Sequence, residues 1–149
     1  MTIRKAENND LQQLIKLLYE FYKESIHKYK IKISAETAVK TAKNFIKNYV
    51  VLVLEDGEKI VGVMAGIVSP SIFDETQLFA QEAIWYINKQ HRKGSGAFKL
   101  LKKFESVCKD LGADIIIMGG MGNLNLEVLN RFYLKNNYIL METHYIKEF

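Results

Sequence analysis

The sequence predicts an α/β protein with a mixed, mostly antiparallel sheet of about six to seven strands flanked by four helices. Segments with apolar residues at every second position alternate with segments whose apolar residues recur three and four positions apart. The length of 149 residues, with 48% hydrophobic and 26% charged residues, suits one compact core. We therefore expect residues 1–149 to form one domain.

The amino-terminal part is predicted to be a short strand followed by two helices. The strand covers residues 2–5. Asn9 has the character of a helix N-cap, and apolar residues at helical spacing follow it to about residue 23. A second helix starts after the capping residue Ser34 and carries apolar residues on one face and lysines on the other. Both helices are expected to cover the sheet.

The remaining elements follow from turn signals and from changes of period. Residues 50–54 and 60–68 form a hairpin because Asp56-Gly57 is a strong turn signal. A βαβ-like crossover follows. It consists of a long strand at 78–88, a glycine-bearing turn, a helix from Ala97 to Gly112 and a short apolar strand at 114–118, which is expected to be buried on both faces. The last predicted elements are a helix at 124–136 closed by Asn136-Asn137 and final strands at 138–141 and 143–147.

Several classes of protein are excluded or disfavoured. The longest apolar runs are far shorter than the roughly 20 residues that cross a bilayer. The first ten residues lack the apolar stretch of a secretory signal, which favours a cytoplasmic protein. The single Cys108 cannot form an intramolecular disulfide, and His27 and His144 lack neighbours at metal-ligand spacing, so no metal is expected.

The basic residues are unevenly distributed. The chain has 21 basic and 17 acidic residues, a net charge of +4, which does not indicate a nucleic-acid partner. The excess lies between residues 23 and 47, where seven lysines face two glutamates. Two interpretations are open: a solvated helix face, or attraction for an acidic partner or an anionic cofactor.

The segment from residue 90 to residue 97 is the strongest candidate for a binding site. It joins a long strand to a helix, and its small residues let a ligand approach the backbone. The first turn of a helix offers free N–H groups, and Arg92 and Lys93 add positive charge, so the segment can bind an anion. The glycine spacing excludes both a Walker A loop and a dinucleotide-binding fingerprint.

The order of elements and two motifs resemble the GNAT superfamily of acetyl-CoA-dependent N-acetyltransferases, and in particular its small stand-alone, phage-type members. Arg92 to Ala97 is similar to the family's [Q/R]-x-x-G-x-[G/A] turn, with Ser95 in place of the central glycine. Tyr133 to Tyr138 is similar to its Tyr-x-x-x-Gly-Phe block. The resemblance covers essentially the whole chain and implies the GNAT fold.

The resemblance also implies where acetyl-CoA binds. The family pairs the backbone of the strand before the turn with the pantetheine arm and holds the pyrophosphate on the turn itself. Leu126 replaces the family's CoA-contacting asparagine, next to Asn125. The implied cofactor-binding residues are Trp85, Tyr86, Ile87, Arg92, Lys93, Gly94, Ser95, Gly96, Ala97 and Asn125.

Two catalytic residues are implied in the same way. Tyr133 matches the family's acid for the leaving thiolate, and Glu82 is the match to its carboxylate base, with Gln81 or a water molecule as alternatives. Strict alternation along residues 78–88 would place Glu82 on the face of Ile84 and opposite Trp85.

The predicted activity is transfer of an acetyl group to a primary amine, on a small molecule or on a protein lysine or amino terminus, by direct attack. The alternative is a catalytically silent GNAT-fold module that binds acyl-CoA or a protein partner, which the departures at Ser95 and Leu126 favour. The alternating residues 143–147 could form the edge of a homodimer. No membrane or nucleic-acid partner is expected.

Overall fold

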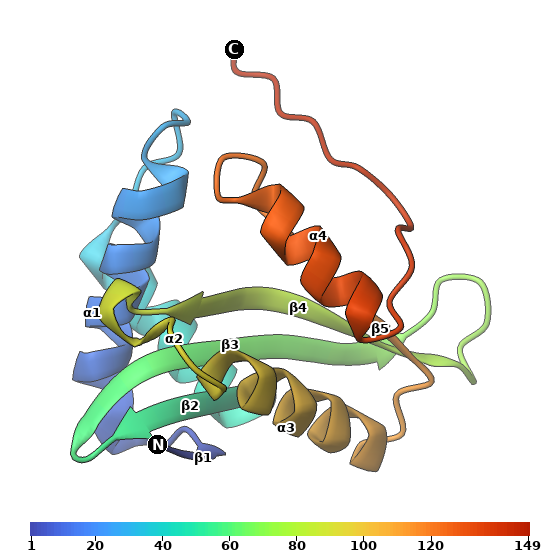
Figure 1. The fold of residues 1–149 in the computed structure, drawn as a ribbon, viewed down its shortest axis with the longest axis horizontal. Helices are drawn as coiled ribbons and strands as arrows, with labels where there is room; N and C mark the ends of the chain where they lie inside the picture. The colour runs from blue at the N-terminus through green and yellow to red at the C-terminus, as the bar shows by residue number, and fades with distance from the viewer.

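The computed structural model describes residues 1–149 as four α-helices and a five-stranded sheet (Figure 1). This confirms the predicted mixed α/β fold with four helices. None of the helices is long and apolar enough to cross a membrane. The elements are β1 (Thr2–Lys5), α1 (Leu11–Phe21), the π-helical turn η2 (Tyr22–Ile26), α2 (Ala35–Asn48), β2 (Val50–Asp56), β3 (Lys59–Pro70), β4 (Leu78–Ile87), α3 (Gly96–Asp110), β5 (Ile115–Ile117) and α4 (Leu126–Lys135).

The strands lie in the order β1-β2-β3-β4-β5, and each follows its neighbour along the chain. All pairs are antiparallel except β4 with β5, which are parallel and joined through α3. The predicted βαβ-like crossover is therefore confirmed. The β2–β3 hairpin also forms, with Gly57 at φ 62°, a left-handed conformation that favours glycine.

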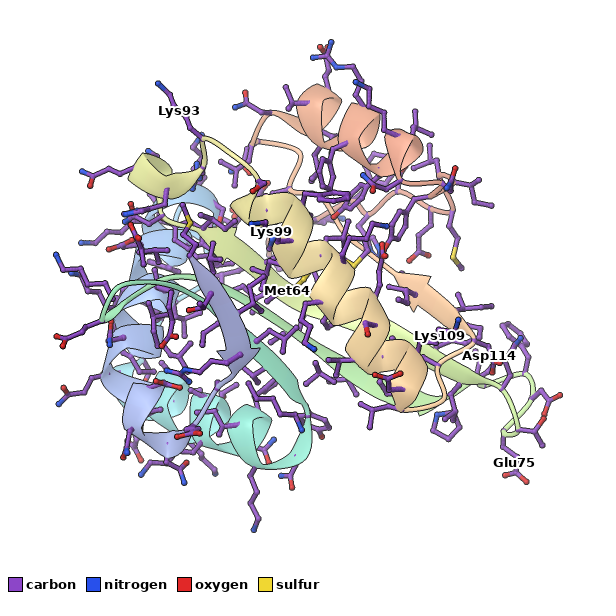
Figure 2. The ribbon with its side chains drawn as sticks, turned by 60° about the horizontal axis from the view of Figure 1, so that its bottom comes forward. Met64, Glu75, Lys93, Lys99, Lys109 and Asp114 are labelled. Atoms are coloured by element: carbon purple, nitrogen blue, oxygen red, sulfur yellow. The ribbon has the colours of Figure 1, made fainter.

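The helices cover both faces of the sheet and enclose two apolar clusters. Phe104 and its neighbours on α3 pack with Leu54 and Met64 on one face, where Phe132 of α4 joins them. Leu14 and Leu17 of α1 pack against the other face together with residues of α2. Figure 2 shows Met64 in the space between the sheet and α3. The amphipathic patterns of the sequence therefore correspond to real buried faces.

The helix ends agree with the predicted caps except at α1. The Ser34 hydroxyl accepts the Thr37 N–H at 3.4 Å at the start of α2. Asn9 is not the N-cap of α1, because residues 8–10 form a short 3-10 turn and α1 starts at Leu11. The Asp10 carboxylate holds this turn by accepting the Glu7 N–H at 2.7 Å.

The last helix ends as the sequence predicts. Asn137 has φ 64°, and its N–H bonds to the Leu134 carbonyl while the Tyr138 N–H bonds to the Tyr133 carbonyl. These two bonds are those of a Schellman motif with asparagine in the left-handed position. The chain therefore leaves α4 in a defined direction.

The prediction of two final strands is wrong, and so is the expected total of six to seven. Residues 138–141 and 143–147 form no strand. The tail leaves the Schellman turn, runs past α4 and is held at its far end by Glu148, which accepts the Lys30 N–H at 2.6 Å (Figure 1). It is therefore not placed beside β5. As a result β5 is an edge strand, and Ile115 is 39% exposed rather than buried on both faces.

Gly66 of β3 gives a test of the packing between the sheet and α3. A Cβ atom there would lie 2.5 Å from Phe104 Cζ and 2.7 Å from the Gln81 carbonyl oxygen. We expect Gly66→Ala to destabilise the protein by about 1–3 kcal/mol, because both the ring and the β4 backbone must move. Urea unfolding measures the loss.

Gly122→Ala is the matched control, since a Cβ there meets nothing within 4 Å. We expect its free energy of unfolding to stay within about 0.5 kcal/mol of the unsubstituted protein. Equal stability of the two variants would contradict the close packing at Gly66.

Candidate active site

A β-bulge in β4 decides which side chains face α4. Ala65 of β3 pairs with Ile84, whereas the next residue, Gly66, pairs with Glu82, so Ala83 is the extra residue. An extra residue reverses the alternation of faces along a strand. Glu82 therefore lies on the same face as Trp85, and the expectation from strict alternation is wrong.

The two predicted catalytic residues meet at Gly119, in the segment that follows β5. The Glu82 carboxylate accepts the Gly119 N–H at 2.9 Å, and the Tyr133 hydroxyl donates to the Gly119 carbonyl at 2.8 Å. Gln81 precedes Glu82 in β4, so its side chain points to the opposite face. Of Glu82 and Gln81, it is therefore Glu82 that the fold brings beside Tyr133.

The surroundings of Tyr133 are aromatic, and the residue is half-buried. Its ring centroid lies 6.2 Å from that of Trp85 and 5.3 Å from that of Tyr138. Loss of hydration, and then the nearby charge of Glu82, raise the pKa of the Tyr133 phenol well above its ordinary value. The hydroxyl is therefore protonated at neutral pH.

Burial also raises the pKa of Glu82. Loss of hydration raises the pKa of the Glu82 carboxyl above its usual range, and the hydrogen bond from the Gly119 N–H opposes this rise only in part. A carboxyl whose pKa is raised toward neutrality is suited to proton transfer.

The edge of β4 next to this pair has free backbone groups. β5 pairs only with residues 79–81 of β4, so residues 82–87 have no partner strand on that side. The Asn88 N–H bonds to the Val61 carbonyl of β3, and alternate residues of an antiparallel strand face the same neighbour. The backbone of Tyr86 therefore faces β3, and that of Trp85 faces the open edge.

Ile87 also faces the open edge, but its carbonyl is occupied. It accepts a hydrogen bond from Arg92 Nε at 2.7 Å. The free groups of the predicted pantetheine-binding strand are thus the N–H and carbonyl of Trp85 and the N–H of Ile87. Of the three predicted residues, Trp85 and Ile87 thus face the open edge, and Tyr86 faces β3.

The glycine-bearing turn leads into α3 in the way an anion site requires. Gly94 has φ 103°, which favours glycine. The first hydrogen bond at the start of α3 runs from the Lys99 N–H to the Ser95 carbonyl, so the N–H groups of residues 96–98 lack an acceptor within the helix. Gly96 has a packing role as well, because a Cβ there would lie 3.0 Å from Leu54 Cδ2.

The two charged residues of the turn differ in their surroundings. Arg92 is directed to η2, where its guanidinium pairs with Glu24 at 2.7 Å and lies 5.3 Å from the centroid of the Tyr86 ring. Lys93 instead extends away from the protein before α3 (Figure 2). Figure 2 also shows Lys99 on the first part of α3, a cation that lies outside the Arg92–Ala97 motif.

The start of α4 carries two asparagines with different roles. Asn125 is in a left-handed conformation at the start of α4, with φ 39°, and its side chain makes no capping hydrogen bond. Asn123 Nδ2 donates to the Ser25 carbonyl of η2 at 2.9 Å, although 98 residues separate them. No local pattern could have selected Asn123, since its partner is far away in the sequence. This contact joins the segment after β5 to the end of α1.

Comparisons with known proteins support the fold. No protein-family profile matches the chain, and no curated protein is significantly similar to it. A ribosomal-protein-alanine N-acetyltransferase from Brucella melitensis biovar Abortus 2308 is 12% identical with a TM-score of 0.73, and the alignment covers 100% of both chains.

Two further structures resemble this chain over nearly its full length. An aminoglycoside acetyltransferase from an uncultured soil metagenomic sample is 17% identical with a TM-score of 0.74, covering 99% of this chain and 95% of the other. A transcriptional regulator from Bacillus halodurans C-125 is 20% identical with a TM-score of 0.81, covering 99% of both. The chain therefore has the GNAT acetyltransferase fold that the sequence predicts.

The raised pKa of Glu82 predicts the sign of a change in stability. In the pH range between its unfolded and folded pKa values, the folded protein binds more protons than the unfolded chain, so stability falls as the pH rises through this range. We expect Glu82→Gln to raise the melting temperature at pH 7. The difference should disappear below about pH 4, where the unfolded carboxyl is also protonated.

Asp10→Asn is a control of opposite sign. The hydrogen bond from Arg4 holds the pKa of the Asp10 carboxyl below its ordinary value, so its charged form stabilises the fold. We expect this variant to melt at a lower temperature at pH 7. A Glu82→Gln variant that also melts lower at pH 7 would show that Glu82 is stabilised in its charged form.

Proposed function

We propose that the chain is an N-acetyltransferase that moves the acetyl group of acetyl-CoA to a primary amine by direct attack. The observation that carries this proposal is the meeting of Glu82 and Tyr133 at Gly119, beside the unpaired edge of β4. A base, an acid and a free strand edge next to each other are what this reaction needs. The GNAT fold supports the proposal.

The free backbone groups fit acetyl-CoA. Those of Trp85 and Ile87 can pair with the amide groups of the pantetheine arm as a further strand would. The unpaired N–H groups at the start of α3, with the backbone of Gly94 and Ser95, can bind the pyrophosphate. Lys93 and Lys99 supply positive charge there. Asn125 is available as a further polar contact.

Arg92 has a different role in this proposal from the one its motif implies. Its guanidinium is engaged with Glu24, Tyr86 and the Ile87 carbonyl, so it positions the end of β4 against η2. The phosphate contacts then fall to the lysines and the backbone.

Each candidate catalytic residue can perform one proton transfer. The amine nitrogen forms a bond to the thioester carbonyl carbon, and the C–S bond then breaks. Glu82 accepts the proton that the ammonium loses, directly or through a water molecule, and its raised pKa favours this role. The Tyr133 hydroxyl, rotated away from the Gly119 carbonyl, donates the proton that the leaving thiolate takes, and the second proton lost by the nitrogen restores the Tyr133 hydroxyl.

A catalytically silent module is the second candidate. The pairing of Arg92 with Glu24 favours it, together with Ser95 and Leu126, since all three weaken the match to the family's cofactor site. One similar structure is described as a transcriptional regulator. A homodimer stays a prediction, and the open edge of β5 is a surface that it could use.

Calorimetric titration separates the two candidates. We expect micromolar binding of acetyl-CoA and CoA, and none of NAD or ATP, because only the CoA species carry the pantetheine arm. Binding without release of free CoA in the presence of amines would support the silent module. No binding of any of the four would contradict the cofactor site.

Replacement of Tyr133 tests the mechanism. We expect Tyr133→Phe to lower kcat about 100-fold or more, because the acid is removed, with the affinity for acetyl-CoA unchanged. Tyr138→Phe is the matched control: it removes a hydroxyl that bonds to Glu105 and retains the ring packed on Tyr133. Equal turnover of the two variants would exclude Tyr133 as the acid.

A further inference from the structure

The connection between α1 and α2 is strongly basic. We call residues 23–32 the lysine loop, since it contains Lys23, Lys28, Lys30 and Lys32, all of them exposed. Its single acidic residue is Glu24, whose carboxylate accepts the Tyr86 hydroxyl at 2.6 Å and pairs with Arg92 at 2.7 Å. The charge of Glu24 is therefore neutralised, and the loop presents positive charge.

The lysine loop adjoins the candidate active site. Ser25 of the loop accepts the hydrogen bond from Asn123, which lies four positions after Gly119. Glu24 contacts Tyr86 in the part of β4 that has no partner strand. The loop thus contacts both β4 and the segment that leads into α4. In Figure 1 the α1–α2 connection rises beside the start of α4.

Glu24, at the start of the lysine loop, contacts Arg92 of the turn before α3, whereas Lys30, near the end of the loop, contacts Glu148 of the tail. α3 packs on one face of the sheet, and α1, which leads into the loop, packs on the other. With acetyl-CoA held at the start of α3, an amine that reaches the open edge from the opposite face passes the lysine loop.

Lys30 of the lysine loop contacts a carboxylate of this chain. The Glu148 carboxylate of the tail accepts the Lys30 N–H at 2.6 Å and lies 3.6 Å from Lys30 Nζ. The preceding tail residues, 139–147, make no backbone–backbone hydrogen bond. A carboxylate on an otherwise loosely held peptide segment is thus bound at two points, by a backbone N–H and by an ammonium group.

We propose that the acceptor of this enzyme is a primary amine flanked by carboxylates, such as the amino terminus of an acidic peptide, and that the lysine loop selects it. This inference rests on the proposed function. Exposed lysines attract carboxylates and repel polycationic amines over a range of about one Debye length. Glu148 occupies part of the same surface and competes with such an acceptor.

Peptide binding tests the inference independently of turnover. The probe is a short fluorescent peptide with a free amino terminus followed by three glutamates, compared with versions carrying three glutamines or three lysines. Anisotropy is measured in the presence of CoA, which cannot react. We expect the glutamate peptide to bind at least tenfold more tightly than the glutamine peptide. This difference should shrink at about 0.5 M salt, because salt screens the attraction between exposed charges. Equal binding would overturn the inference.

Charge-reversal variants locate the effect. We expect the triple variant Lys28→Glu, Lys30→Glu and Lys32→Glu to lose the preference for the glutamate peptide while its affinity for acetyl-CoA is unchanged. The control carries the same change of charge on the exposed face of α2, at Lys40, Lys43 and Lys47. An equal loss in the control would assign the preference to net charge and overturn the role of the loop.

Two further measurements complete the test. Glu148→Gln should tighten binding of the glutamate peptide severalfold, since it frees Lys30. Acetyl transfer to the three peptides is measured separately. Selective binding without transfer would contradict the proposed function but not the selectivity of the loop. Faster transfer to the lysine peptide than to the glutamate peptide would overturn the inference and leave the proposed function intact.

Discussion

The parallel pairing of β4 with β5 ends after three residue pairs, and the candidate site depends on this early end. Beyond Gln81 and Ile117 the two segments separate, so the backbone of Trp85 has no partner. A fully paired β5 would satisfy these groups internally and leave no edge for a ligand. The unpaired edge therefore places the site in this part of the sheet.

Two contacts fix the position of the segment that follows β5. The bulge at Ala83 turns Glu82 toward α4, where it bonds to Gly119. The next residue, Gly120, lies so close to α4 that a Cβ there would be 2.8 Å from Leu126 Cδ1 and 3.0 Å from Leu129 Cδ2. The segment after β5 is thus held between the Glu82 side chain and α4.

Most of the fold could be predicted from the sequence because helices and turns depend on nearby residues. The helix faces, the Asp56-Gly57 hairpin and the left-handed Asn137 follow from local patterns. The bulge could not be predicted, since the extra residue at Ala83 is defined only by the strand that β4 pairs with. The tail alternates like a strand, yet its contact with Lys30 holds it away from β5.

In the candidate site too, some features could be predicted from the sequence and others could not. The meeting of Glu82 with Tyr133 agrees with the motif resemblance, because that resemblance includes the tertiary arrangement of a family. The motif placed Arg92 at the phosphates, but its side chain is directed by Glu24, a residue from a distant part of the chain. Gly96 belongs to the motif and is also required by its contact with Leu54.

Gly119 bonds to both candidate catalytic side chains, Glu82 and Tyr133, and so links their positions. Its N–H and its carbonyl flank one Cα atom, so a rotation about either backbone bond of this residue displaces the partner of Glu82 or that of Tyr133. A residue without a Cβ resists such rotations least. In the proposed acetyltransferase, the acidic and basic limbs of a pH–rate profile would then shift together when Gly119 is substituted, although Glu82 and Tyr133 are both unchanged.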